Sequence, residues 1–301
     1  MAAETTISTL TGWLTTLLSK VYSWYALDPN CAQKFVRIEP VAGFAGAPGG
    51  NVVAFTRITK DTALSATITD GTGLSNVALD TAQVTATVAE WGIMRQNTKL
   101  GSRSSMTGEE GLIMVDVRDG VQMCLEYFET LTWATYANAS LSTGTSGGVF
   151  TIANVVELQS GMVTQKAKGR KVVMLPATAA KNLRTEVVAS GAAIFGAGAG
   201  DGMLAATADD GHVGSFLGEN FYTNNLAGTS GANSIGAMVV DGSPGGNPEG
   251  SPTGCAVAWM PEPTPLFYNP VNSGGIQLAV TMAAGFVEVN DFAYRKIATI
   301  T

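Results

Sequence analysis

His212 is the only histidine in the chain, and it follows two carboxylates in the sequence Asp209-Asp210-Gly211-His212. A histidine beside a carboxylate suits general-base catalysis, and Ser146 lies in the pattern G-x-S-x-G that marks the nucleophile of α/β-hydrolases. That nucleophile needs a strand before it and a helix directly after it. Here a long helical pattern precedes Ser146 and glycines surround it. A serine hydrolase using Ser146 and His212 is therefore only an alternative, and we expect His212 to be a loop residue.

Other cofactor and metal motifs are missing from the sequence. Glycines at 196, 198, 200 and 202 follow a helical pattern and lack the spacing of a dinucleotide-binding turn, and no G-x-x-x-x-G-K-[ST] sequence occurs. Three widely spaced cysteines, Cys31, Cys124 and Cys255, predict reduced thiols and neither a disulfide framework nor a zinc site. We therefore expect no catalytic residues, no cofactor and no metal.

The composition describes a large protein with little charge. The chain has 301 residues, of which 14% are charged and 36 are glycine, and its net charge is -7. A surface with so little charge predicts that other copies of the chain cover much of it. The negative charge argues against a protein that grips phosphate backbones. The start of the sequence resembles neither a secretory signal nor a membrane span.

One long helix, predicted over residues 107–139, organises the rest of the chain. Thr107 and Glu110 have the spacing of a capping box. Polar residues recur at steps of three and four and share one face: Asp116, Asp119, Gln122, Glu126 and Glu129. Apolar residues occupy the remaining faces: Ile113, Val117, Val121, Cys124, Leu125, Phe128, Leu131 and Trp133. Such a helix, roughly 45 Å long, must be covered on most sides.

A long β-ribbon is expected before this helix. Residues 51–59 and 83–93 are rich in β-branched residues and predict two antiparallel strands. The connection between them, residues 60–82, is too long for an ordinary hairpin. We interpret it as an arm that reaches over another molecule, because an isolated ribbon is marginally stable. Residues 6–25 form a separate amphipathic helical pattern, whose apolar face we expect to dock on this subunit or a neighbour.

The second half alternates between short elements and glycine-rich loops. Helices are predicted at 154–167 and 177–188, and the basic residues after the first suit a solvated helix end. Residues 190–211 and 224–252 are predicted loops, and prolines 261, 263 and 265 an extended link. Strands are predicted at 172–175, 213–222, 235–240, 255–260, 277–283 and 286–300. We expect two subdomains, with both C-terminal strands returning to the sheet of the first.

In this order, the segments resemble the major capsid proteins of tailed bacteriophages with the HK97-like fold, and most closely the branch typified by phage N4. The resemblance is carried by residues 50–57, Leu79 with 84–88, Trp91-Gly92, Val115-Asp116, 172–176, Leu183-Arg184, 211–218 and 285–291. It covers most of the chain, although each segment alone is degenerate. Trp91-Gly92 replaces the usual Tyr-Gly, and the scaffolding extension of some relatives is absent.

The resemblance implies an α+β HK97-like capsid fold. It implies an N-terminal arm (1–49), an extended loop (50–98), a peripheral domain with the spine helix (99–151), an axial domain (152–261) and returning peripheral strands (262–301). Inter-subunit contacts are expected from the arm and the loop, at Trp13, Leu14, Leu17, Lys60, Leu64, Ile68 and Leu74. Cross-linking through Lys60 is a minor alternative, since no partner residue is marked.

The implied function is a coat protein that self-assembles into an icosahedral shell around double-stranded DNA. Expected partners are further copies in hexameric and pentameric capsomers, a portal, scaffolding or decoration proteins, and packaged DNA without sequence-specific contact. No membrane partner is expected. The expected location is the virion capsid, assembled in the host cytoplasm. An encapsulin-like compartment shell is the alternative within this fold, and a secreted β-rich adhesin is a further rival.

Overall fold

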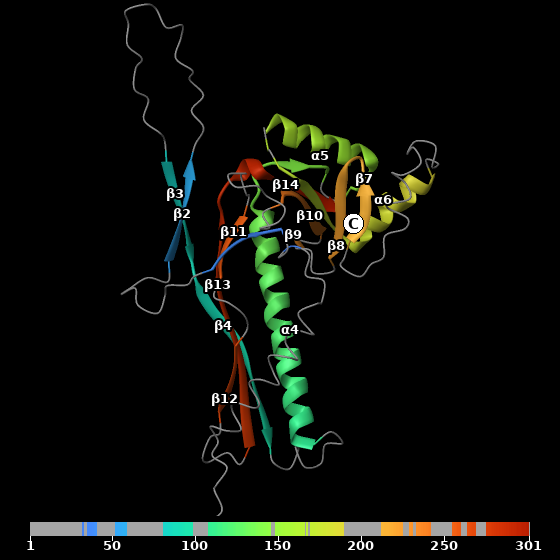
Figure 1. Ribbon diagram of the computed structural model, residues 1–301. Coiled ribbons are helices and arrows are strands. Elements are labelled where there is room, and N and C mark those ends of the chain that lie inside the picture. Colours follow the sequence, from blue (N-terminus) through green and yellow to red (C-terminus); the bar gives the residue numbers. More distant parts are fainter. Residues whose placement is uncertain are drawn as a thin grey trace, which may run out of the picture.

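The computed structural model describes residues 32, 35–40, 52–58, 81–98, 108–145, 148–165, 167, 169–189, 212–224, 229–230, 233–241, 255–259, 264–268 and 275–300. These residues form three α-helices, a five-stranded sheet, a seven-stranded sheet and a separate two-stranded ribbon. Figure 1 shows the long helix α4 beside the five-stranded sheet, with the seven-stranded sheet and two shorter helices near its upper end. Mixed helices and sheets were predicted, and this architecture confirms them.

Helix α4 runs over Gly108–Ala137 and confirms the predicted long helix. Its 30 residues span about 45 Å at the usual helical rise. One side packs against β13 and β4, where Val117, Val121 and Cys124 are buried. The polar positions do not form a uniformly exposed stripe, because Asp116 and Glu129 are buried. Thr107, half of the predicted capping box, lies outside the described residues.

The five-stranded sheet has the order β1 (Arg37–Pro40), β11 (Cys255–Trp259), β13 (Gly275–Glu288) and β12 (Thr264–Tyr268), with β4 (Ala89–Thr98) also paired to β13. Strands β4 and β13 are antiparallel from Thr98 and Gly275 to Ala89 and Ala284. Leu278, Val280, Met282 and Ala284 alternate along β13 and are all buried. They belong to the same core as the apolar side of α4, so this helix covers one face of the sheet.

The seven-stranded sheet has the order β5 (Ser142–Thr143), β14 (Tyr294–Ile300), β10 (Asn233–Val240), β6 (Lys171–Pro176), β8 (Glu219–Asn224) and β7 (His212–Phe216), and β9 (Thr229–Ser230) pairs with β10. Helices α5 (Ile152–Thr164) and α6 (Ala177–Ala189) share a buried cluster with one face of it. Alternate residues of β6 and β10 join the core around α4. The predicted strand and helix around Pro176 are confirmed.

Three predictions about the C-terminal strands were wrong. A single strand β13 runs through Ala284 and Gly285, where a break was predicted. The break falls at the short 3-10 helix η3 (Asp291–Ala293), whose start is capped by the Asn290 side chain accepting from the Phe292 N–H. Strand β14 then pairs with β10 in the seven-stranded sheet, so only β13 returns to the first sheet.

Local turn chemistry explains the remaining differences. The predicted strand over 213–222 is a hairpin of β7 and β8, because Leu217 and Gly218 both have positive φ, 52° and 83°. His212 therefore lies in a strand and not in a loop. Helix α5 begins after Thr151, whose side chain pairs with Asn154 in a capping box, two residues before the predicted start. Pro265 belongs to β12, at the margin of its sheet, where a missing N–H is tolerated.

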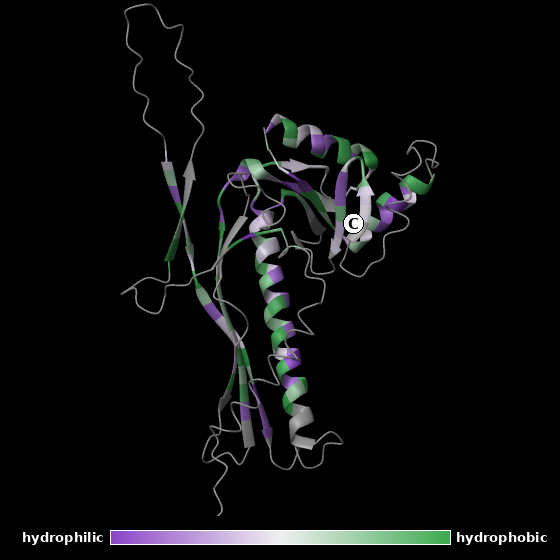
Figure 2. Cartoon of the chain, viewed as in Figure 1, coloured by the Kyte–Doolittle hydropathy of each residue, from purple (hydrophilic) through white to green (hydrophobic). Residues whose placement is uncertain are grey.

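Figure 2 shows hydrophobic residues along α4 and in the strands beside it. The first core joins α4 to both sheets, and the second lies between the seven-stranded sheet and helices α5 and α6. Within the described part of the chain, no helix has the length and hydropathy needed to cross a membrane.

Candidate assembly surface

A two-stranded ribbon projects from the rest of the molecule in Figure 1. It consists of β2 (Val52–Ile58) and β3 (Thr81–Thr87), paired antiparallel from Val52 and Thr87 to Ile58 and Thr81. The two predicted strands are thereby confirmed, although the predicted second strand is divided at Val88 into β3 and β4. The 22 residues between β2 and β3 lie outside the described part of the chain.

The base of the ribbon is fixed to β13. Phe55, Ala86 and Val88 form a small buried cluster, against which Ala283 and Val287 of β13 pack. The backbones come so close that a Cβ added at Gly285 would lie 2.7 Å from the Thr87 carbonyl oxygen. A side chain at position 285 would therefore push the ribbon off the sheet. Glycine at this crossing lets one long strand carry the ribbon directly on its backbone.

Most of the ribbon is uncovered by its own chain. Val52 is 49% exposed, and Ala54, Thr81, Gln83, Thr85 and Thr87 are also exposed. An isolated two-stranded ribbon buries too little apolar surface to be stable in water. The exposed part of the ribbon is therefore a surface that another molecule could cover, and such cover stays a prediction.

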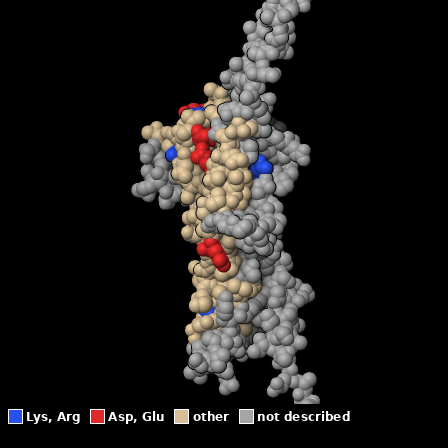
Figure 3. Space-filling view, turned by 90° about the vertical axis from the view of Figure 1, so that its left-hand side faces the viewer, with Lys and Arg blue, Asp and Glu red and all other residues tan. Residues whose placement is uncertain are grey.

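The face of the five-stranded sheet turned away from α4 carries an apolar row. Leu266, Ala279 and Met94 are paired across β12, β13 and β4, so their side chains share one face. Leu266 and Met94 are exposed, the latter by 63%. In Figure 3, which presents this side of the molecule, charged groups are few and scattered among uncharged side chains on the described surface. Low charge is what the core of a protein interface requires.

The outer face of α4 is also partly apolar. Val115, Met123 and Tyr127 are exposed along it, and Met123 and Tyr127 line a groove of about 470 Å³ together with Trp91, Ile93 and Cys124. The Tyr127 ring meets the Trp91 ring edge-on, with centroids 5.4 Å apart. The helix is therefore covered on fewer sides than its sequence predicted.

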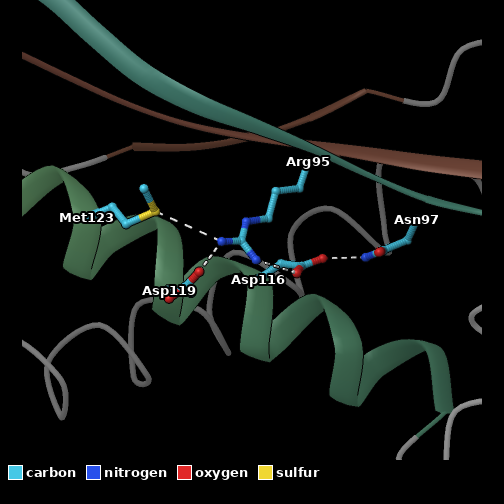
Figure 4. A network of polar contacts seen from close by, with 5 residues as sticks. All are labelled: Arg95, Asn97, Asp116, Asp119 and Met123. Carbon is cyan, nitrogen blue, oxygen red and sulfur yellow. Dashed lines mark hydrogen bonds and ion pairs between the residues drawn. The ribbon is translucent and has the colours of Figure 1, made fainter.

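A polar network links β4 to the first half of α4 (Figure 4). The Arg95 guanidinium donates to Asp119 and lies 3.6 Å from Oδ1 of Asp116, while the Asn97 amide donates to the other Asp116 oxygen. Arg95 Nη2 also lies 3.9 Å from the Met123 sulfur. Asp116 is buried and Asp119 is half exposed, so water screens the Asp119 carboxylate much more than the Asp116 carboxylate. These contacts hold the strand and the helix in register.

Helix α5 presents a second apolar stripe, at the outside of the seven-stranded sheet. Val149, just before the helix, is 59% exposed, and Val156 and Val163 within it are 52% and 67% exposed. Within the helix, the spacing of seven residues places Val156 and Val163 on one side. This spacing is visible in the sequence, but exposure could not be foreseen, because Val155, Leu158 and Met162 offer an equally good apolar face that the fold buries.

The predicted contact residues Trp13, Leu14, Leu17, Lys60, Leu64, Ile68 and Leu74 all lie outside the described part of the chain. Ser146 lies outside it as well, so the hydrolase pair is not tested by geometry. Among the described residues, no group of three His, Cys, Asp or Glu side chains converges as a metal site would require.

No protein-family model matches this sequence, and no curated protein matches it. Solved structures do match. The head structure of Helicobacter pylori bacteriophage KHP40 superposes with a TM-score of 0.63 at 10% identity, covering 90% of both chains. This chain has a capsid-protein fold. The capsid of a native GTA particle gives a TM-score of 0.62 at 11% identity, covering 91% of both chains. The SrpI encapsulin of Synechococcus elongatus PCC 7942 gives 0.55 at 10% identity, covering 90% of this chain and 88% of that chain.

The predicted capsid fold is thus confirmed at the level of overall architecture. Identities near 10% carry the fold and not the function. The boundaries of the arm, extended loop, peripheral domain and axial domain stay predictions, as does the N4-type branch.

Proposed function

We propose that this chain is a major capsid protein that self-assembles into the icosahedral shell of a tailed bacteriophage around double-stranded DNA. The observation that carries the proposal is the likeness to head and capsid proteins over about nine-tenths of both chains. An uncovered ribbon, a sheet face with few charged groups and an apolar helix stripe on one subunit support it. The role is structural, with no catalysis.

In this proposal the partners are copies of the same chain in hexamers and pentamers, with a portal and scaffolding or decoration proteins. The shell is the virion capsid and forms in the host cytoplasm. The net charge of -7 fits a container that does not adhere to DNA over its whole lining. The predicted regions 1–49, 50–98, 99–151 and 152–261 serve as arm, extended loop, peripheral domain and axial domain, and region 262–301 returns to the peripheral domain through β13.

The contact residues of the proposal are Trp13, Leu14 and Leu17 in the arm and Lys60, Leu64, Ile68 and Leu74 in the connection between β2 and β3. In this proposal the apolar side chains spaced along both segments bury their surface against a neighbouring subunit. Obligate assemblies typically bury some thousands of Å² per contact, roughly 2,000–5,000 Å². Two such contact segments on each copy would supply area of that kind.

The experiment replaces residues 59–80 by Asn-Gly, which favours a two-residue turn between β2 and β3. The anchored ribbon base at Phe55, Ala86 and Val88 is kept, so thermal unfolding should match the parent. Sedimentation should show that capsomers and particles are lost. A full-length variant with Lys60, Leu64, Ile68 and Leu74 changed to serine should lose assembly in the same way. Particle formation by both variants at the parental level would overturn the assignment.

Two alternatives make different predictions. An encapsulin-like shell would enclose protein cargo, so purified particles would contain other proteins and no packaged DNA. A serine hydrolase would lose ester hydrolysis in Ser146→Ala and would react with a fluorophosphonate probe. The capsid proposal expects neither cargo protein nor probe labelling.

A further inference from the structure

A short segment near the N-terminus contacts α4 and both large sheets. The described residues of this segment, Ala32 and Phe35–Pro40, are called the strap. Its β1 strand pairs in parallel with β11, from Arg37 opposite Ala256 to Pro40 opposite Trp259, in the five-stranded sheet. The Phe35 ring lies 4.7 Å from the Tyr222 ring of β8, in the seven-stranded sheet. The strap therefore contacts both sheets within a few residues.

The third attachment is to α4. The backbone N–H of Ala32 donates to Oε1 of Glu129 at 2.9 Å, and the Trp133 indole N–H donates to the same oxygen at 3.1 Å. Glu129 and Trp133 are both fully buried. A buried carboxylate is costly unless donors satisfy it, so the position has a specific task. One of its donors belongs to a residue 97 positions away.

These three attachments meet in one core. Ala32, Phe35 and Val36 are buried together with residues of α4, of β13 and of strands β6 and β10. In Figure 1 the strap's β1 is the blue strand beside β11, near the upper part of α4, where the two sheets approach each other. The strap, α4, β13 and two strands of the seven-stranded sheet therefore share one core, and the Ala32–Glu129 hydrogen bond ties the strap to α4 there.

We infer that the strap locks the two sheets at a fixed angle on α4, and that Glu129 is the residue that closes the lock. The inference rests on the proposed function for its consequence, since the angle between the sheets sets how neighbouring subunits curve. A subunit with an open strap retains its helices and sheets but samples several angles. Closed shells of one size then give way to particles of several sizes.

The test compares Glu129→Ala with Glu129→Gln. Glutamine keeps Oε1 as an acceptor for both donors, whereas alanine leaves the Ala32 and Trp133 N–H groups without it. Hydrogen exchange on unassembled subunits should show about a tenfold or greater rise in rate for the amides of residues 35–39 in Glu129→Ala, with the first half of α4 still protected. Glu129→Gln should stay near the parental rates.

Phe35→Ala provides a second route, because it removes the Tyr222 contact without altering Glu129. It should loosen the same residues, which keeps the inference testable if Glu129→Ala does not fold. Parental exchange rates at residues 35–39 in folded Glu129→Ala or folded Phe35→Ala would overturn the strap, whatever particles these variants form. Strap opening without any change in particle size would overturn its role in curvature. A parent chain that never forms particles contradicts the capsid proposal and leaves the exchange result interpretable.

Discussion

Gly285 and Thr87 meet backbone to backbone where the ribbon crosses β13, and a Cβ at Gly285 would come within 2.7 Å of the Thr87 carbonyl oxygen. Such a distance is far inside the ordinary contact distance of carbon and oxygen. The crossing joins the exposed ribbon to β13, the longest strand of the described part of the chain. The position of the ribbon therefore depends on the absence of a side chain at one residue.

Gly285→Ala should lower the free energy of unfolding by about 1–3 kcal/mol, because backbone atoms have to move to admit the methyl group. Amides of β2 and β3 should also exchange faster. Chemical denaturation and hydrogen exchange measure both effects. Ala54→Ser is the matched control, since it adds one atom at an exposed position of the same ribbon and should change stability by less than about 0.5 kcal/mol. If Gly285→Ala leaves the free energy of unfolding unchanged, the ribbon does not pass as close to Gly285 as the structure has it.

Val121→Asp should prevent folding of the subunit. The Val121 side chain is only 3% exposed in the core beside β13, and an unpaired carboxylate there costs several kcal/mol, roughly 3–5. Val115→Asp makes the same change on the same helix at a position that is 54% exposed, and should remain soluble and folded. Circular dichroism and solubility report the difference. Equal behaviour of the two variants would mean that the faces of α4 are assigned wrongly.

Asp116 and Asp119 should contribute unequally to the free energy of unfolding, although both contact Arg95. Asp116→Ala leaves the Asn97 amide and part of Arg95 without a buried acceptor and should cost about 1–3 kcal/mol. Asp119 is half exposed, so Asp119→Ala should cost less than about 1 kcal/mol and its effect should shrink at high salt. Urea unfolding at low and high salt measures both. The reverse order would contradict the network in Figure 4.

Burial raises the pKa of the Cys124 thiol above its ordinary value, and the thiol donates weakly to the Val280 carbonyl oxygen at 3.8 Å. The reactive thiolate is therefore scarce in the folded subunit. In a variant with Cys31 and Cys255 changed to alanine, maleimide labelling of Cys124 should be slow when folded and fast in urea. Rapid labelling of the folded protein near neutral pH would contradict the burial of Cys124.

Burial also raises the pKa of Glu219, despite opposing effects of the Gln159 hydrogen bond and of Lys171. The folded state then holds the proton more tightly than the unfolded state, so the associated stability is present below the ordinary value near 4.5 and is lost as pH rises. Glu219→Gln removes this loss and can still accept from Gln159. The variant should have the higher Tm at pH 7 and an equal Tm at about pH 4. If Glu219→Gln instead has the lower Tm at pH 7, the pKa of Glu219 is not raised by folding.

Local patterns were enough to predict the helix around Val121 and the strand and helix on either side of Pro176. In both places apolar spacing, turn residues and burial agree. Local patterns failed at Gly285, because a glycine inside a strand resembles a strand break. In the structure the strand continues, and the missing side chain lets β3 pass close to it. They failed at Leu217 too, because leucine rarely adopts positive φ and the turn is stabilised by its surroundings.

The lock at Glu129 could not be predicted either. In the sequence this residue continues a polar series that begins at Asp116, and its partner Ala32 is 97 positions away. In the fold Glu129 accepts a hydrogen bond from the strap and is buried, whereas Glu126 is only half-buried. The same limit applies to Val156 and Val163, since two apolar faces on α5 compete and the sheet covers one.

The most direct test of the capsid assignment is the particle mass of the purified full-length chain, expressed alone and with the scaffolding proteins of its source, measured by sedimentation and electron microscopy. The assignment predicts pentamers, hexamers or closed shells that contain many copies. A monomer or dimer under every condition, including high protein concentration, would contradict it.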